Sequence, residues 1–184
     1  MNVKISVIMS VYNGGEFLKE AIESILNQSY KNIEFVIIND GSSDDSLVII
    51  QKYMAMDSRI LLINQKNMGL TKSLNIGVMR ATGKYIARQD ADDISMPDRF
   101  KLFFEFLEKD GDIDMYSTPA ILFNKDHPIT KVIPNYFRRN GFNQSMLNYH
   151  NSLIHGTLII KSSLIKKFKY NEFFKYSQDF ELYH

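Results

Sequence analysis

The sequence has no cysteine among its 184 residues. Disulfides and thiolate metal ligands are therefore excluded, and a metal site would have to use oxygen or histidine ligands. The absence of cysteine is compatible with a reducing compartment. Long apolar runs are missing as well, since none approaches the roughly 20 residues that span a bilayer. Residues 1–6 also lack the charged-then-apolar order of a signal peptide, so we expect a soluble, cytoplasmic chain.

An excess of charge of either sign is also missing. The chain carries 22 basic and 21 acidic side chains, for a net charge of +1. This balance gives no indication of non-specific nucleic-acid binding. The 45% of hydrophobic and 23% of charged residues are ordinary for a globular protein, and the length fits one domain with a sizeable core.

Short apolar, β-branched runs alternate with amphipathic stretches over the first 110 residues. The pattern predicts strands at 5–9, 34–38, 60–63 and 85–88, and helices at 16–27, from 43 or 44 to 56, 71–81 and 97–109. Continuous apolar strands separated by helices are typical of a mostly parallel sheet that is covered on both faces. We therefore predict an α/β fold with a Rossmann-like central sheet.

The alternation loosens in the remainder of the chain, where we predict strands at 116–123, 131–133 and 157–160 and helices at 142–149 and 161–167. We interpret residues 1–110 as one half of a single domain and residues 111–184 as its smaller, mixed second half. The chain ends at His184, inside a stretch with the sequence of a helix's first turns, so we expect it to be truncated at the C-terminus.

Polar residues follow three of the predicted strands: Ser10-Val11-Tyr12-Asn13, Asn39-Asp40-Gly41-Ser42 and Asp90-Ala91-Asp92-Asp93. The carboxyl ends of parallel strands share one edge, where ligands bind. Tyr12 offers an aromatic face for a base, and Asp40 can accept a hydrogen bond from an imide N–H. Asp90 can accept one from a ribose hydroxyl. The pattern predicts a nucleoside diphosphate site, although neither glycine-rich phosphate motif occurs in the chain.

Three carboxylates lie within four positions at Asp90–Asp93. Because they repel one another, the cluster needs a counterion or a special setting. A hard cation such as Mg²⁺ or Mn²⁺, held by Asp92 and two bridged phosphates, is one solution. The alternative is an acidic turn in which Asp93 caps the helix that follows.

The chain resembles glycosyltransferase family 2. The motifs SVIMSVYN (6–13), SILNQSY (24–30), EFVIINDGSSD (34–44), NMGL (67–70), NIG (75–77), ATGKYIA (81–87) and DADD (90–93) occur in family order. The resemblance implies a GT-A fold, a nucleotide-diphosphate sugar donor (most often a UDP-sugar), Mn²⁺ or Mg²⁺, and inversion at the anomeric carbon. It is closest to the bacterial enzymes that build capsule, lipopolysaccharide or exopolysaccharide, whose acceptors are glycans or lipid-linked saccharides. It also implies work at the inner face of the cell membrane, with peripheral association through a missing C-terminal region.

The resemblance also implies roles for individual residues, position by position. Ser10, Val11 and Tyr12 contact the nucleotide, with Tyr12 stacked on uracil, while Asp40 reads the uracil N3–H. A dTDP donor presents the same imide. In the Asp-X-Asp motif, Asp90 and Ala91 lie near the ribose and Asp92 binds the metal. Two positions depart from the family pattern: Asn39 replaces a common aspartate, and Ser10 a common proline.

Further positions have two interpretations each. Asp179, which follows Gln178 where the family commonly has glutamate, matches the catalytic base, or it complements a helix dipole. His155 lies on the acceptor side, or is a hydrogen-bonded structural residue. Lys72 approaches the diphosphate, or is a solvated lysine. Arg99 is expected to be a surface charge or to pair with Asp98. Residues 136–139 form an acceptor or membrane patch, or a solvated turn.

The leading hypothesis is an inverting, metal-dependent glycosyltransferase that moves a hexosyl or N-acetylhexosaminyl group. The second is a non-catalytic or truncated nucleotide-sugar-binding module. The third is a sugar-nucleotide nucleotidyltransferase, which shares the nucleotide and metal chemistry. Enzymes of that class usually open with a glycine-rich loop carrying Arg and Lys, and the loop that begins at Ser10 has neither.

Overall fold

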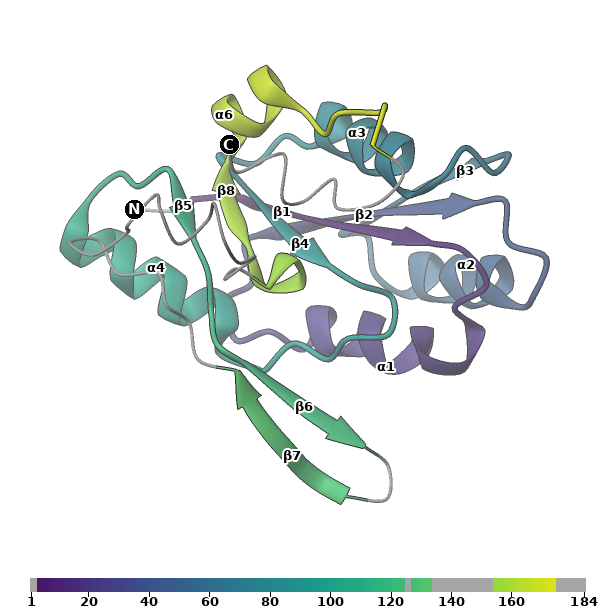
Figure 1. Ribbon diagram of the computed structural model, residues 1–184, viewed down its shortest axis with the longest axis horizontal. Coiled ribbons are helices and arrows are strands. Elements are labelled where there is room, and N and C mark those ends of the chain that lie inside the picture. Colours follow the sequence, from purple (N-terminus) through teal and green to yellow (C-terminus); the bar gives the residue numbers. More distant parts are fainter. Residues whose placement is uncertain (1–2, 125–126, 134–153, 175–184) are drawn as a thin grey trace.

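The computed structural model describes residues 3–124, 127–133 and 154–174. A six-stranded sheet in the order β3-β2-β1-β4-β8-β5 forms its centre (Figure 1). The first four strands are mutually parallel, and β8 joins β4 in the antiparallel sense. The strands of this sheet are β1 (Ile5–Val11), β2 (Ile33–Asp40), β3 (Ile60–Gln65), β4 (Tyr85–Gln89), β5 (Met115–Tyr116) and β8 (Ile159–Lys161). The predicted α/β fold with a mostly parallel sheet is confirmed.

Helices cover both faces of this sheet, as the unbroken apolar strands predict. Apolar residues of α1, α2 and α4 pack on one face with alternate strand residues such as Val7 and Phe35. Those of α3 and α6 pack on the other face with the intervening residues such as Ile8 and Val36. The helices are α1 (Gly15–Leu26), α2 (Ser46–Met56), α3 (Leu70–Arg80), α4 (Arg99–Asp110) and α6 (Ser162–Phe168). None of the described helices has the length and apolar content needed to cross a membrane.

Helix α4 begins two residues later than the sequence predicts. The carbonyl of Pro97 accepts a hydrogen bond from the Ser29 amide at 2.9 Å, and the Asp98 carboxylate accepts one from the Ser29 hydroxyl at 2.6 Å. These contacts tie the segment before the helix to the end of α1. Because α4 starts at Arg99, Asp93 lies too far upstream to cap it, and the capping interpretation of Asp93 is wrong.

The second half of the chain completes the sheet in the antiparallel sense. β6 (Ala120–Asn124) and β7 (His127–Ile133) form a separate hairpin that projects from the body (Figure 1). Residues 155–157, of which Thr157 was predicted to begin a strand, form a 3₁₀ turn, η1 (His155–Thr157), so that β8 starts at Ile159. The helix predicted at 142–149 lies outside the described residues.

Candidate functional site

The loops that follow β1 and β2 are joined by hydrogen bonds. The registers place Val11 opposite Asn39, and Met9 opposite Gln89 in β4. The Asn13 amide donates to the Ser42 hydroxyl at 3.0 Å, and the Ser43 amide donates to the Asn13 side chain at 2.8 Å. These strand-end loops therefore lie together at the carboxyl edge of the sheet.

The loop after β4 meets the loop after β1 at the same edge. A Cβ placed on Gly14 would lie 3.4 Å from the Cβ of Ala91. Tyr12 is 58% exposed at this edge, so its ring is accessible to a ligand. The Val11 side chain is fully buried in the core, and any contact it makes with a nucleotide must come from its backbone. Ser10 is half-buried beside it.

Asp40 anchors the loop that leads into α3. The residue is only 2% exposed. One carboxylate oxygen accepts hydrogen bonds from the Gln65 side chain and the Met68 amide, both at 2.8 Å, and the other accepts from the Gly69 amide at 2.9 Å. Asp40 therefore fixes the start of α3, and Lys72 in the first turn of this helix is exposed. The predicted contact of Asp40 with a nucleobase stays a prediction.

Gly41 allows the loop after β2 to come close to the loop that contains Asn67. Its φ of 72° lies in the left-handed region, and a Cβ at this position would lie 2.5 Å from the Asn67 amide nitrogen. Any other residue would push the two loops apart. Asn39, where the family often has aspartate, is buried and donates to Asn64 at 2.8 Å. A neutral amide avoids the cost of burying a second charge beside Asp40.

The acidic turn Asp90–Asp93 is held from inside the protein by Gln89. The buried Gln89 amide nitrogen donates to the carbonyls of Asp93 at 2.8 Å and Asp90 at 3.2 Å. Ala91 packs against the core, whereas the Asp92 and Asp93 side chains are exposed. The Gln89 side chain therefore holds both ends of the turn through hydrogen bonds to the backbone carbonyls of the turn.

Two buried arginines lie beneath this turn. The Arg88 guanidinium forms an ion pair with the Asp90 carboxylate. Arg99 is only 6% exposed, and its guanidinium donates to Gln89 Oε1 at 3.1 Å and Ser95 Oγ at 2.9 Å. The expectation that Arg99 is a surface charge or a partner of Asp98 is wrong, because the side chain turns back from α4 into the protein.

The surroundings shift the pKa values of these groups. Desolvation lowers the pKa of Arg99 to about 10, although the nearby carboxylates of Asp93 and Asp90 act in the opposite direction. Although Asp93 as a whole residue is exposed, its carboxylate lies against η1, where partial desolvation raises its pKa, and the charges of Asp90 and Asp92 raise it further. The protein thus supplies two internal counterions for its three carboxylates. Repulsion within the turn, taken alone, is a weaker argument for a metal than the sequence indicated.

The η1 turn lies directly against these carboxylates. Arg99 also donates to the Gly156 carbonyl at 3.1 Å and the Arg88 carbonyl at 2.9 Å. A Cβ placed on Gly156 would lie 2.7 Å from Asp93 Oδ2 and 3.1 Å from Asp90 Oδ2. Glycine at position 156 therefore lets η1 pack closely on the acidic turn.

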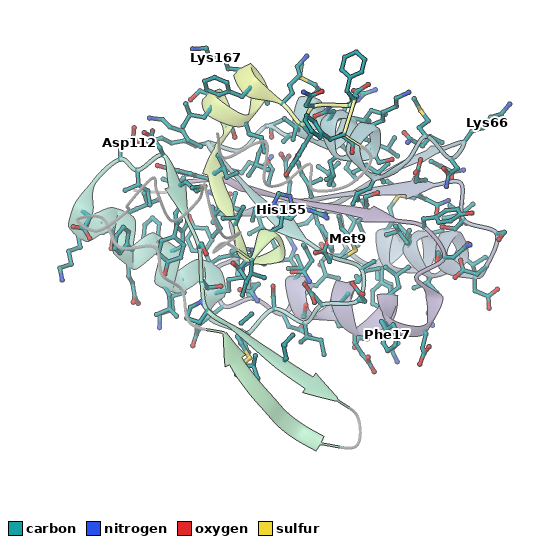
Figure 2. All side chains as sticks on the ribbon, viewed as in Figure 1. Met9, Phe17, Lys66, Asp112, His155 and Lys167 are labelled. Atoms are coloured by element: carbon teal, nitrogen blue, oxygen red, sulfur yellow. The ribbon has the colours of Figure 1, made fainter. Side chains whose placement is uncertain are left out.

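His155 directly precedes Gly156 in η1, and its side chain is labelled in Figure 2. Its Nε2 lies 3.0 Å from the Tyr170 hydroxyl, and the two rings meet edge to face. This hydrogen bond favours the structural interpretation of His155. Its predicted place on the acceptor side stays a prediction.

The carboxylates of the acidic turn suit a metal ion that is also coordinated by a bound substrate. Among the described residues, no three histidine or carboxylate side chains converge as a metal cluster. Asp90 is paired with Arg88, which leaves Asp92 as an exposed carboxylate at the tip of the turn. One or two carboxylates completed by substrate phosphates are the usual setting for Mg²⁺. Asp179, Gln178 and residues 136–139 lie outside the described residues.

Sequence reasoning missed Arg88 and the contact of Gly156 with the acidic turn, and it wrongly expected Arg99 at the surface. A signal for Arg88 was present, because a charged residue inside an apolar strand, two positions before Asp90, lies on the same face as that aspartate and needs a partner. Nothing in the sequence indicates the contact between Gly156 and the acidic turn, because that contact joins segments more than 60 residues apart.

Comparison with known proteins identifies the family to which this sequence is similar. The profile described as Glycosyl transferase family 2 matches residues 6–168. An uncharacterized glycosyltransferase of Haemophilus influenzae is 34% identical over 97% of this chain and 58% of its own length. Another, MJ1057 of Methanocaldococcus jannaschii, is 36% identical over 97% of this chain and 63% of its own length. The chain therefore spans less than two thirds of these relatives.

Solved structures share the fold. Residues 1–349 of Staphylococcus aureus TarS, in complex with UDP-GlcNAc, superpose with a TM-score of 0.78 at 20% identity, over 97% of this chain and 52% of that one. The mannosyltransferase PcManGT of Pyrobaculum calidifontis, in complex with GDP-Man and Mn²⁺, gives a TM-score of 0.65 at 17% identity, over 89% and 46%. At these identities the likeness concerns the fold alone.

Proposed function

The chain belongs to glycosyltransferase family 2 and has the GT-A fold, and from this premise we propose that it transfers a sugar from a nucleoside diphosphate donor to a glycan or lipid-linked acceptor. The observation that carries the proposal is the meeting of three strand-end loops at one edge of the sheet. Those loops bear an exposed aromatic ring, a buried carboxylate and an acidic turn, which together suit a base, a ribose and a diphosphate.

A UDP-sugar is the donor we favour. TarS has been solved with UDP and with UDP-GlcNAc, which supports a uridine donor for this chain as well. In our proposal Tyr12 stacks on the base, Ser10 and Val11 contact it through the strand end, and Asp40 reads the imide. Because Asp40 already accepts three hydrogen bonds, it would hold the base and the 66–69 loop together. A dTDP-sugar, which presents the same imide, is the nearest alternative.

A divalent cation is the proposed partner of the diphosphate, with Asp92 as its protein ligand and Mn²⁺ or Mg²⁺ as the ion. The Mn²⁺ bound to PcManGT supports this choice. Such an ion, when bound, neutralises the negative charge of the departing diphosphate. Asp90 and Ala91 lie beside the ribose in this proposal, and Lys72 reaches toward the phosphates from the first turn of α3.

The acceptor side is proposed to lie where η1 meets the acidic turn, with His155 nearby. In an inverting transfer, a carboxylate takes the proton of the acceptor hydroxyl as that oxygen displaces the diphosphate from the anomeric carbon. We assign this base to Asp179. The proposed setting is cell-surface polysaccharide synthesis in the cytoplasm, at the inner face of the membrane.

A panel of donors tests this function. Thermal melting with UDP, dTDP and GDP and their sugars, each with and without Mn²⁺, should show the largest rise in Tm for UDP-sugars with metal, because specific ligands stabilise the folded state. Slow hydrolysis of the same donor should accompany binding. A protein that no nucleoside diphosphate stabilises, with or without metal, would contradict the proposal.

A non-catalytic nucleotide-sugar-binding module is the second candidate. Its support is that the described residues on which the proposal relies, Tyr12, Asp40 and Asp92, are all assigned to donor binding. Stabilisation by a UDP-sugar without hydrolysis or transfer, in this chain and in a version extended to the relatives' length, would support the binding module over the enzyme.

A further inference from the structure

Arg99 joins segments that are far apart in the sequence. One terminal nitrogen of its guanidinium holds Gln89 and Ser95, which flank the acidic turn. The other holds the carbonyl of Gly156, 57 residues further along the chain, and reaches the Leu158 carbonyl at 3.5 Å. Arg99 is the first residue of α4, and its side chain links the acidic turn to η1.

We propose that Arg99 is a positioning residue of the donor site, which fixes the acidic turn against η1 so that Asp90 and Asp93 are held at this junction and Asp92 is presented to the cation and the diphosphate. This inference rests on the proposed function. Arg99 does not touch the ligand in this account. It acts through Gln89, whose amide in turn holds the carbonyls of Asp90 and Asp93.

The chemistry of the guanidinium suits this task. Arginine presents five N–H donors in a rigid, planar fork and keeps its charge when buried. The fork donates to two side-chain oxygens and to backbone carbonyls on both sides of the junction. A lysine would keep the charge, but its single nitrogen could not span the same oxygens. Charge and bridging can therefore be separated by experiment.

The different positions of the three carboxylates in the acidic turn support the same role for Arg99. Arg88 pairs with Asp90, and Asp90 and Asp93 both lie against the position that a Gly156 side chain would occupy. Asp92 is exposed, and none of its atoms is among those nearest to that position. If Arg99 releases η1, Asp90 and Asp93 gain room to rotate, and the turn no longer presents one fixed carboxylate.

Gly156 provides a second way to disturb the junction without removing the arginine. An alanine there would place its Cβ within 3.1 Å of both carboxylates. Because these atoms are the ends of the Asp93 and Asp90 side chains, Gly156→Ala should displace the two carboxylates while the charge of Arg99 is kept. This variant serves if the arginine variants do not fold.

The test is the effect of Mn²⁺ on UDP affinity, measured by calorimetry on the folded protein. The variants are Arg99→Lys, Arg99→Met and Gly156→Ala, and the matched control is Lys101→Met, an exposed residue of α4. We expect the factor by which Mn²⁺ tightens UDP binding to fall about 10-fold in Arg99→Met, the scale typical of residues that orient metal ligands. Arg99→Lys and Gly156→Ala should lose most of the factor as well, and the control should keep it.

A merely structural role predicts a different outcome. It would lower Tm in the Arg99 variants but leave the Mn²⁺ factor of the folded molecules unchanged, and that result would overturn the inference. An unchanged factor in Gly156→Ala would overturn it equally if the arginine variants fail to fold. A wild-type chain that does not bind UDP would instead overturn the proposed function, and the inference with it.

Discussion

Arg88 and Asp90 lie two positions apart on the same face at the end of β4, and their side chains form an ion pair. Arg88 is buried, whereas about a third of the Asp90 side chain is exposed. The acidic turn therefore begins with a carboxylate whose charge is already balanced from within the strand.

Replacing Arg88 with methionine should leave Asp90 without its partner and destabilise the fold by about 1–3 kcal/mol, the usual cost of an unmatched polar group. Urea denaturation of Arg88→Met measures this loss. In the double variant Arg88→Met/Asp90→Asn the unpaired charge is gone, and part of the stability should return. Strictly additive losses in the double variant would contradict the pairing.

Glu34 joins β1, β2 and the start of β4 at the opposite edge of the sheet. Burial alone would raise the pKa of Glu34, but hydrogen bonds from Lys4, Ser6 and Thr82 outweigh it and lower the pKa from 4.5 to about 2. Because the pKa is depressed in the folded state, the stabilisation is fully present above pH 4.5 and is lost as the pH falls toward 2.

Glu34→Gln should therefore reduce the free energy of unfolding at pH 7 by about 1–3 kcal/mol, and the gap from wild type should narrow as the pH falls from 5 to 3. Denaturant melts across this pH range measure both effects. Glu105→Gln is the control, since Glu105 is an exposed carboxylate 3.9 Å from Lys101. A gap that does not change with pH would contradict the assignment.

At Gly77, α3 packs closely on the sheet. A Cβ at this position would lie 2.6 Å from Ile8 Cγ2 and 2.9 Å from Ile38 Cδ1, both buried. Gly77→Ala should therefore overpack this face and cost about 1–3 kcal/mol, despite the better helix propensity of alanine. Thermal melting checks it against Gly14→Ala, whose nearest contact is 3.4 Å. A Gly77→Ala variant as stable as wild type would show that the two layers can separate.

The fold was largely predictable because its signals are local. The four parallel strands and α1 to α4 were placed to within a few residues, since continuous apolar runs and helical stripes report burial directly. η1 was not predicted, because the apolar run that contains Leu158 and Ile159 reads as a strand from its composition. What starts the strand late is the hydrogen bonding of Thr157 and Leu158 to the turn before them.

The site was predictable only in part. Tyr12, Asp40 and the acidic turn follow strands, so their common edge could be inferred from topology. The burial of Arg99 could not, because a charged residue at a helix start is usually solvated. Its partners include a backbone carbonyl at Gly156, and such contacts leave no mark on composition or spacing.

Asp179 is expected to act on the acceptor and not on the donor. Asp179→Asn should keep the UDP-sugar affinity within about 3-fold, because binding does not require the base, and should lose at least about 100-fold in transfer rate, the lower end of general-base effects. Calorimetry and a transfer assay separate the two steps. Unchanged transfer would remove Asp179 from the mechanism.

The most direct test of the donor site is calorimetry of UDP with Mn²⁺ on the wild type, Tyr12→Ala and Asp92→Asn. Tyr12→Ala should weaken UDP binding about 10-fold with or without metal, on the scale of one lost base stack. Asp92→Asn should weaken it only when Mn²⁺ is present, because Asp92 is assigned to the cation. Wild-type affinity in both variants, under both conditions, would contradict a nucleotide site at this edge of the sheet.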